Sequence, residues 1–336
     1  MAKPPTVEDV ALAAGVSRQT VSNVLNTPDI VREKTRERVR QAISELGYRP
    51  QVAARRLRTR RSSTIGIHLD PYAGGISGVV LDRFVHALTE HASDRGMRIQ
   101  LYAARSPAEE IDRMRELTDG GEIDAVVITG TFPGDPRTRW LADRGIPFVS
   151  FGRPWGEDDV AVPAHLWVDV DGAAGTRAAT VEVLARGGSR VAFLGWPVGS
   201  GTGDERERGW REAMATADAD GRRLVSEEGV GLARAVVEEF LADGEGVDGI
   251  VCASDALAIG AHLAAASAGM AELPIIGFDN TPAAEAMGLS SVEQLPERVA
   301  VGVLELLMGA SGSVVAPRTP AAGSAHVLVE PQLVLR

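Results

Sequence analysis

The chain has 336 residues, enough for two or three domains, and its 44% hydrophobic and 24% charged residues are typical of a globular protein. No apolar run reaches the roughly 18 residues of a membrane-spanning helix, and the N-terminus lacks the apolar core of a signal peptide. The single cysteine, Cys252, lies in an apolar run, which excludes a disulfide or a cysteine-based zinc site within one chain. These features predict a cytoplasmic protein.

The charge is distributed unevenly. The whole chain carries a net charge of −11, which by itself argues against a nucleic-acid partner. Residues 1–61, however, hold 13 Arg and Lys against 6 Asp and Glu, a net charge of +7, whereas the remaining residues carry −18. Such asymmetry favours a basic head that contacts phosphates and an acidic body that does not, although a solvated basic tail is the alternative.

Three helices are predicted in the basic head. Thr6 followed by acidic residues marks the start of the first helix, and Gly15 marks its end. Ser17 caps the second helix, and a third runs from about residue 32 to 46 and stops at Gly47. Apolar positions of the first helix, Leu12 among them, supply an inward face. A helix, a short turn and a second helix are the sequence form of a helix-turn-helix unit.

The outward residues of the second helix suit a DNA groove. Arg18 can donate two hydrogen bonds to guanine, and Gln19 and Asn23 can each pair with adenine. Ser17, Thr20 and Ser22 carry short hydroxyls that suit phosphate oxygens. An ordinary surface helix could carry the same residues, but it would more often show Glu–Lys pairs. The pattern therefore predicts a DNA-reading helix.

Residues 50–62 are rich in arginine and too short for a stable isolated helix. This segment could order on DNA, with Leu57 inserted as an apolar wedge in the minor groove. The alternative is an ordinary basic linker.

The runs TVEDVALAAGVSRQTVSNVLN, TRERVRQAISELGYRP and AARRLRT resemble the head and hinge of the LacI family of bacterial regulators. The resemblance implies a DNA-binding domain at 1–49, a hinge helix at 50–62 and a sensing domain at 63–336. Two residues depart from the family pattern: Asn23 stands where arginine is common, and Arg32 replaces a serine helix cap. The DNA-contacting residues implied are Thr6, Ser17, Arg18, Gln19, Thr20, Ser22, Asn23, Asn26, Tyr48, Ala54, Leu57 and Arg58.

Beyond Ser63, short apolar strands alternate with amphipathic helices, which predicts an α/β fold of parallel sheets covered on both faces. This is similar to the two-lobed periplasmic-binding-protein-like fold (type I) of the family, with doubly wound parallel sheets. By that likeness one lobe contains about 63–167 and 293–322, and the other about 168–292 and 323–336. Ligands bind at the carboxyl ends of such strands.

Polar and aromatic residues follow several predicted strands and suit a sugar, because its C–H faces stack on rings and its hydroxyls bond charged groups. The resemblance implies that Arg206 grips effector hydroxyls, Trp167 contacts a ring and Asp279 supplies a carboxylate. Ser254 stands where Asn is usual. For each position a helix cap or ion pair is the alternative. The candidate effector-binding residues are Asp70, Tyr72, Arg153, Trp167, Asp169, Arg206, Ser254, Asp255 and Asp279.

An enzyme is disfavoured by the sequence. The run GWPVGSGTGD resembles a dinucleotide loop, but Asp204 occupies the third-glycine position and would repel a pyrophosphate. No catalytic elbow, Walker lysine or zinc-protease motif occurs, and the six histidines are scattered. We therefore expect no catalytic residue, no cofactor and no metal.

Together these observations predict a homodimeric DNA-binding transcriptional regulator, because one helix-turn-helix head reads only half of a palindromic operator. We expect a repressor of carbohydrate-utilisation genes that a sugar effector releases. The alternative is co-repression by a purine or another small metabolite. A dinucleotide-dependent enzyme is the alternative of another class.

Overall fold

The computed structural model describes residues 5–48, 61–69, 78–156, 164–244, 246–308, 314 and 326–336. The chain divides into two compact units, a head (Met1–Ser62) and a body (Ser63–Arg336). The predicted contacts at Ala54, Leu57, Arg58, Asp70 and Tyr72 lie outside the described residues, as does the side chain of Asn26. Among the helices of the described part, none is long and apolar enough to cross a membrane.

The head contains α1 (Val7–Ala14), α2 (Arg18–Asn26), the 3-10 turn η1 (Pro28–Ile30) and α3 (Glu33–Leu46). The predicted helix boundaries are confirmed. Thr6 and Asp9 form a reciprocal capping box, Ser17 accepts from the backbone N–H of Thr20, and Gly15 ends α1 at φ 62°. Arg32 makes no side-chain cap at α3, as its replacement of a serine predicts.

The core of the head is small and made of valines. Val10, Val21 and Val39 are fully buried, and alanines on α1 and α3 allow the helices to pack closely. The expectation that Leu12 faces inward is wrong, because its side chain is 85% exposed. Leu12 lies two residues from Val10, so the helical repeat places it on nearly the opposite face of α1.

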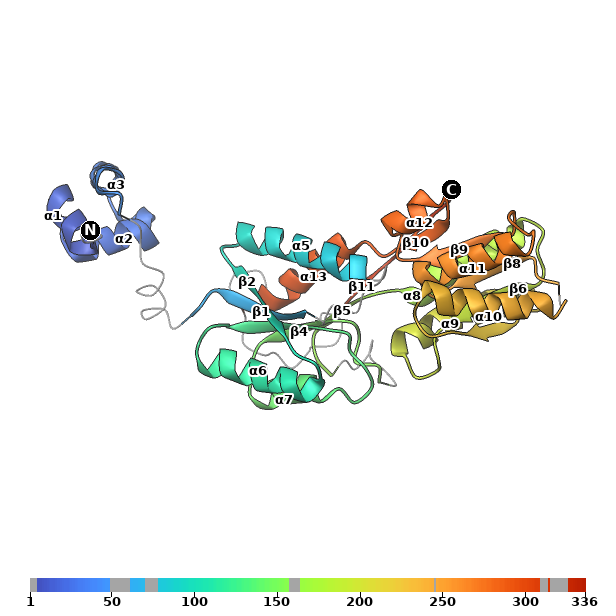
Figure 1. The fold of residues 1–336 in the computed structure, drawn as a ribbon. Coiled ribbons are helices and arrows are strands. Elements are labelled where there is room, and N and C mark those ends of the chain that lie inside the picture. Colours follow the sequence, from blue (N-terminus) through green and yellow to red (C-terminus); the bar gives the residue numbers. More distant parts are fainter. Residues whose placement is uncertain are drawn as a thin grey trace. The chain divides into compact units, whose positions relative to one another are not determined.

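The first sheet of the body has the order β11-β5-β4-β3-β1-β2, with all its strands parallel. Ile67 faces α5 and α13 in one core cluster, and Ile128 faces α6 and α7 in another, so helices cover both faces (Figure 1). We call this sheet and its helices lobe 1. Its elements are β1 (Thr64–Leu69), α5 (Gly78–Asp94), β2 (Arg98–Ala103), α6 (Pro107–Asp119), β3 (Ala125–Thr129), α7 (Pro136–Asp143), β4 (Phe148–Phe151), β5 (Trp167–Val170), α13 (Pro296–Met308) and β11 (His326–Val329).

The second sheet, the centre of lobe 2, has the order β12-β10-β9-β8-β6-β7 and is parallel except for the edge strand β12, which runs antiparallel to β10. Helices α8 and α9 pack as one pair and α10 and α11 as another. The elements are α8 (Gly172–Ala185), β6 (Val191–Gly195), α9 (Gly201–Thr216), β7 (Arg223–Val225), α10 (Val230–Ala242), β8 (Gly249–Cys252), α11 (Asp255–Ser267), β9 (Ile275–Phe278), α12 (Pro282–Ala286), β10 (Ser290–Glu293) and β12 (Gln332–Val334).

The chain passes between the sheets after β5, after β10 and between β11 and β12. The predicted α/β class is confirmed, but two lobe boundaries move. The expected division after residue 167 cuts through β5, and the expected assignment of residues 323–336 to the second lobe separates β11 from its neighbour. In the structure His326 pairs with Trp167 and Val329 with Val170, so both strands belong to lobe 1.

Candidate functional site

The outward face of α2 presents the polar side chains that the sequence singled out. Arg18 and Gln19 are exposed, and Thr20, Ser22 and Asn23 are partly exposed. Gln19 donates from Nε2 to Oδ1 of Asn23 at 2.9 Å, one helical turn away, and Arg18 forms an ion pair with Glu8 of α1 at 2.8 Å. The amide pair keeps the Gln19 and Asn23 side chains side by side on one face of the helix.

Other predicted DNA contacts also have structural roles. The Thr6 hydroxyl and Asp9 carboxylate cap α1, with the Thr6 Oγ1 donating to Asp9 Oδ2 at 2.8 Å. Ser17 caps α2, and its Oγ lies 2.9 Å from that of Thr20. Tyr48 is partly buried against the head core. Thr6 and Ser17 thus define the starts of α1 and α2, and Tyr48 packs against the core that the three helices share.

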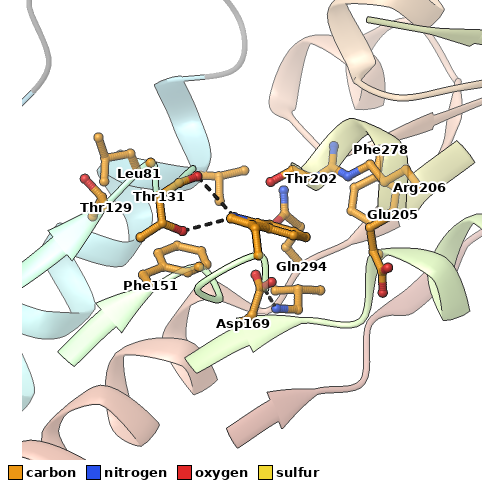
Figure 2. Close-up of a pocket in the computed structure, with 16 residues that line it drawn as sticks. Leu81, Thr129, Thr131, Phe151, Asp169, Thr202, Glu205, Arg206, Phe278 and Gln294 are labelled. Carbon is orange, nitrogen blue, oxygen red and sulfur yellow. Dashed lines mark hydrogen bonds between the residues drawn. The ribbon is translucent and has the colours of Figure 1, made fainter. Parts of the chain in front are cut away.

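A cavity of about 250 Å³ lies in the body, lined from both sheets (Figure 2). Lobe 1 supplies the start of α5 and the carboxyl ends of β3, β4 and β5 with the residues after β3 and β4, and lobe 2 supplies the starts of α8 and α9, the end of β9 and the residue after β10. The site thus forms where the carboxyl ends of parallel strands meet, as the sequence predicts. Its lining residues are Val80, Leu81, Thr129, Gly130, Thr131, Phe151, Gly152, Trp155, Asp169, Val170, Gly172, Thr202, Glu205, Arg206, Phe278 and Gln294.

Arg153 bridges two carboxylates of the cavity. Its Nε donates to Asp169 Oδ2 at 3.0 Å, and its Nη1 lies 3.2 Å from Glu205 Oε1. Both carboxylates line the cavity. Burial raises the pKa of Asp169, while the charge of Arg153 acts in the opposite direction.

Arg206 and Asp279 form a second charged group. The Arg206 Nη1 lies 3.6 Å from Asp279 Oδ1 and donates to the carbonyl of Ala253, and its guanidinium carbon stands 3.7 Å from the centroid of the Phe278 ring. Burial lowers the pKa of Arg206 and raises that of Asp279 to about 7, although each group favours the charged form of the other. Gln294 donates to Asp279 Oδ1 at 2.6 Å.

These two groups leave hydrogen-bonding capacity at the cavity. The Nε of Arg206 and the Nη2 of Arg153 are buried and have no partner among the described residues. Buried guanidinium N–H groups favour an oxygen-rich ligand, since an unpaired buried donor costs about 1–3 kcal/mol. The surrounding carboxylates can in turn accept hydrogen bonds from hydroxyl groups.

Five predicted ligand contacts, Arg153, Trp167, Ser254, Asp255 and Asp279, are not among the residues that line the cavity, and three of them have other partners in the fold. Trp167 is fully buried and stacks on His326, with ring centroids 4.5 Å apart, because β5 lies between β4 and β11 inside the first sheet. Ser254 is the buried cap of α11 and donates to Glu228. Asp255 is also buried and accepts from Ser291 and from the backbone of Thr281. Ser254 is therefore a helix cap, which was the alternative to a ligand contact, and Asp255 has a structural role.

The sequence missed the aromatic walls of the cavity. Phe151, Trp155 and Phe278 all line it, yet each occupies a strand or post-strand position that also suits a core residue. Trp155 could have been predicted from its position, because it lies just past the end of a strand, directly after Arg153 and Pro154. Gln294, just after β10, has the same kind of position.

Two buried side chains, Ser150 and His165, fix the turn after β4. Ser150 donates to the carbonyl of Gly152 at 2.7 Å, and His165 lies 2.9 Å from the Ser150 hydroxyl. Both residues are buried, and burial lowers the pKa of His165 to about 4. Gly152 adopts φ 116°, and a Cβ there would lie 2.4 Å from Thr131 Oγ1, so only glycine fits. This serine–histidine pair supports the turn and does not line the cavity.

No group of three or more His, Cys, Asp or Glu side chains able to hold a metal ion occurs within the described ranges. The cavity combines hydrogen-bonding side chains with aromatic walls, which suits a small molecule that has both polar and apolar surfaces.

Comparison with known proteins agrees with this architecture. Residues 6–51 match the model of bacterial regulatory proteins of the lacI family, and residues 80–298 match that of periplasmic binding proteins and the sugar binding domain of the LacI family. The chain is 34% identical to the HTH-type transcriptional regulator CelR of Thermobifida fusca, covering 84% of each chain. It is 30% identical to the ribose operon repressor of Halalkalibacterium halodurans, covering 86% of this chain and 85% of that one.

A solved structure of a CelR–cellobiose complex is also similar, with a TM-score of 0.69, 28% identity and 99% coverage of both chains. The match to this structure thus extends over both the head and the body of the chain. The chain belongs to the LacI family of bacterial regulatory proteins.

Proposed function

We propose that the protein is a cytoplasmic transcriptional repressor that binds a palindromic operator as a homodimer and is released by a neutral sugar. The cavity carries this proposal. Arg206, stacked on Phe278, and the carboxylates of Asp169 and Glu205 combine a hydrogen-bonding edge with aromatic walls. A pyranose has the matching surfaces, since hydroxyls ring its edge and C–H groups form its faces.

The balance of charge favours a neutral sugar over a phosphorylated or acidic one. Asp169 and Glu205 line the cavity and are already paired with Arg153, and Asp279 is paired with the lining residue Arg206. A phosphate would add negative charge beside these groups, which costs free energy in a partly buried site. The cellobiose complex of the similar regulator supports the same class of ligand.

Release by the sugar follows from linkage between two sites. A sugar that binds better to one angle between the lobes shifts the population toward that angle, and the dimeric heads lose the spacing that the operator needs. Because the sensor acts by binding, the proposed function requires no catalysis.

The test is a thermal-shift panel of mono- and disaccharides, sugar phosphates and purines, followed by operator titrations. A ligand at a hundred times its dissociation constant adds about 2.7 kcal/mol of stability. We expect cellobiose or another neutral sugar to raise the melting temperature and to weaken operator binding in the wild-type protein. A stabilising purine that tightens operator binding would support co-repression instead.

Arg206→Ala should abolish the sugar response and leave operator affinity near the wild-type value. Arg211→Ala is the matched control, because Arg211 lies on the same helix and pairs with Glu207 outside the cavity lining. An Arg206→Ala protein that responds at the same sugar concentration as the control would show that the cavity is not the effector site.

A further inference from the structure

Besides the ion pair between Arg83 of α5 and Glu293 of β10, two contacts join the lobes beside the cavity. Both come from residues 153–155, which follow β4 in lobe 1, and both reach the first turns of α9 in lobe 2. One is the ion pair between Arg153 and Glu205, and the other is the packing of the Trp155 indole against Gly201.

The indole is fixed on the side of lobe 1. Trp155 Nε1 donates to the carbonyl of Thr131 at 3.1 Å and lies 3.2 Å from its Oγ1, as the dashed lines at Thr131 in Figure 2 show. The Thr131 hydroxyl in turn donates to the carbonyl of Arg153 at 2.8 Å. Trp155 also adopts φ 61°, a conformation that L-residues hold only when their surroundings impose it.

The contact with lobe 2 requires glycine. A Cβ placed on Gly201 would lie 2.2 Å from Cδ2 of the Trp155 ring and 2.6 Å from two other ring atoms. The ring therefore rests directly on the backbone at the first residue of α9. A methyl group there must push the indole away, and its two bonds to Thr131 resist that movement.

Both contacts border the ligand space. Trp155 and Glu205 line the cavity, as does Asp169, which shares Arg153 with Glu205, and the three ion-pair side chains are only 12–13% exposed. A hydroxyl that bonds either carboxylate competes with Arg153, and a sugar ring on the indole changes its position. Gly201, by contrast, is not among the lining residues.

We infer that residues 153–155 and the Gly201–Glu205 turn of α9 form a clasp that sets the angle between the lobes and couples it to occupancy of the cavity. This rests on the proposed function for the identity of the ligand, but the clasp itself is a property of the chain alone. Its key residue outside the cavity is Gly201.

The first experiment measures the distance between the lobes in the full chain without sugar. Spin labels are attached at Glu90→Cys on α5 and Glu239→Cys on α10, two exposed helical positions, and labelled protein is diluted with unlabelled chain. Cys252 is buried and stays unlabelled. We expect Gly201→Ala to lengthen or broaden the inter-lobe distance distribution. Gly231→Ala is the matched control, because Gly231 lies in the first turn of α10 with no atom near its Cβ position.

The second experiment titrates cellobiose and lactose by calorimetry. Gly201→Ala should lower sugar affinity roughly tenfold while Gly231→Ala does not, since the indole loses its position as a stacking wall. If Gly201→Ala folds poorly by circular dichroism, Trp155→Leu, which removes the ring without adding a clash, takes its place.

An unchanged distance distribution in Gly201→Ala and in Trp155→Leu would overturn the clasp. If wild-type protein binds a disaccharide and both variants bind it equally well, the coupling is overturned. If neither disaccharide binds the wild-type protein, these two sugars are not its effectors. The spin-label distances between the lobes still decide whether the clasp sets the angle between them.

Discussion

The head and the body of this protein use polar residues in opposite ways. In the head, Arg18 and Gln19 stand on the surface of α2 above a core of valines, and their partners lie on the same or the neighbouring helix. In the body, Arg137 and Arg206 are buried, and they pair with carboxylates distant in the sequence. From this comparison we expect substitutions on the outward face of α2 to change operator binding alone, whereas substitutions of the buried body charges should change the stability of the protein as well.

The network around Arg137 illustrates the body. Its guanidinium pairs with Glu110 at 2.7 Å and with Asp135 at 2.6 Å, and it donates to the carbonyls of Thr129 and Gly130, which line the cavity. Tyr102 donates to the same Glu110, and burial beside that carboxylate raises the pKa of its hydroxyl. This buried network thus fixes the Thr129–Gly130 segment, which forms part of the cavity wall.

The largest expected effect follows from removing this guanidinium. Arg137→Ala leaves two buried carboxylates without their partner, so we expect a loss of about 3–5 kcal/mol in the free energy of unfolding. Urea unfolding of the full chain measures it. Arg139→Ala on the same helix is the control, since that side chain is 87% exposed. Equal losses in the two variants would contradict the contrast between buried and surface charges.

A second expected effect is a pH dependence at Asp279. Its pKa rises from an ordinary value near 4 to about 7 in the folded protein, so the folded state holds a proton that the unfolded state has lost. The stability of the wild type relative to Asp279→Asn should therefore be greatest below pH 4, fall between pH 4 and 7, and level off above. Thermal melts across this range measure the difference.

Asp248 provides the control for that titration. Hydrogen bonds from Arg190 and from the backbone of Ser189 lower its pKa. The contribution of Asp248 is therefore constant above about pH 4 and is lost only in more acidic solution. The stability difference between the wild type and each variant is compared from pH 4 to 7. If that difference changes equally for Asp248→Asn and for Asp279→Asn, the pH dependence does not come from Asp279.

The smallest expected effect tests the head. Gln19→Ala should weaken operator binding roughly tenfold to hundredfold, the range for losing one good amide–base pair, and leave the unfolding of the body unchanged. Gel-shift or anisotropy titrations measure it. Gln41→Ala on α3 removes a similar exposed amide, which bonds Glu45 one turn away, and should have little effect. Equal losses in both variants would remove Gln19 from the base-reading surface.

The sequence by itself determined the head. Thr6 and Ser17 cap helices through residues three positions away, and Gly15 ends α1 by its own conformational freedom. Such signals act within one turn, so they can be read without knowing the fold. The same reasoning located most strands of the body, because a buried parallel strand is a short continuous apolar run. The inward placement of Leu12 is wrong for a local reason, because the 3.6-residue repeat already puts it on nearly the opposite face of α1 from Val10.

Only the tertiary structure decided the cavity. Asp169 and Arg206 both line it, but Trp167, which shares a strand face with Asp169, is fully buried because the ring of His326 on the neighbouring strand β11 covers it. Trp155 lines the cavity because Thr131 of a neighbouring strand end holds its indole and Gly201 of the other lobe receives its face. Those contacts depend on strand order and on the approach of two sheets, which no local pattern contains.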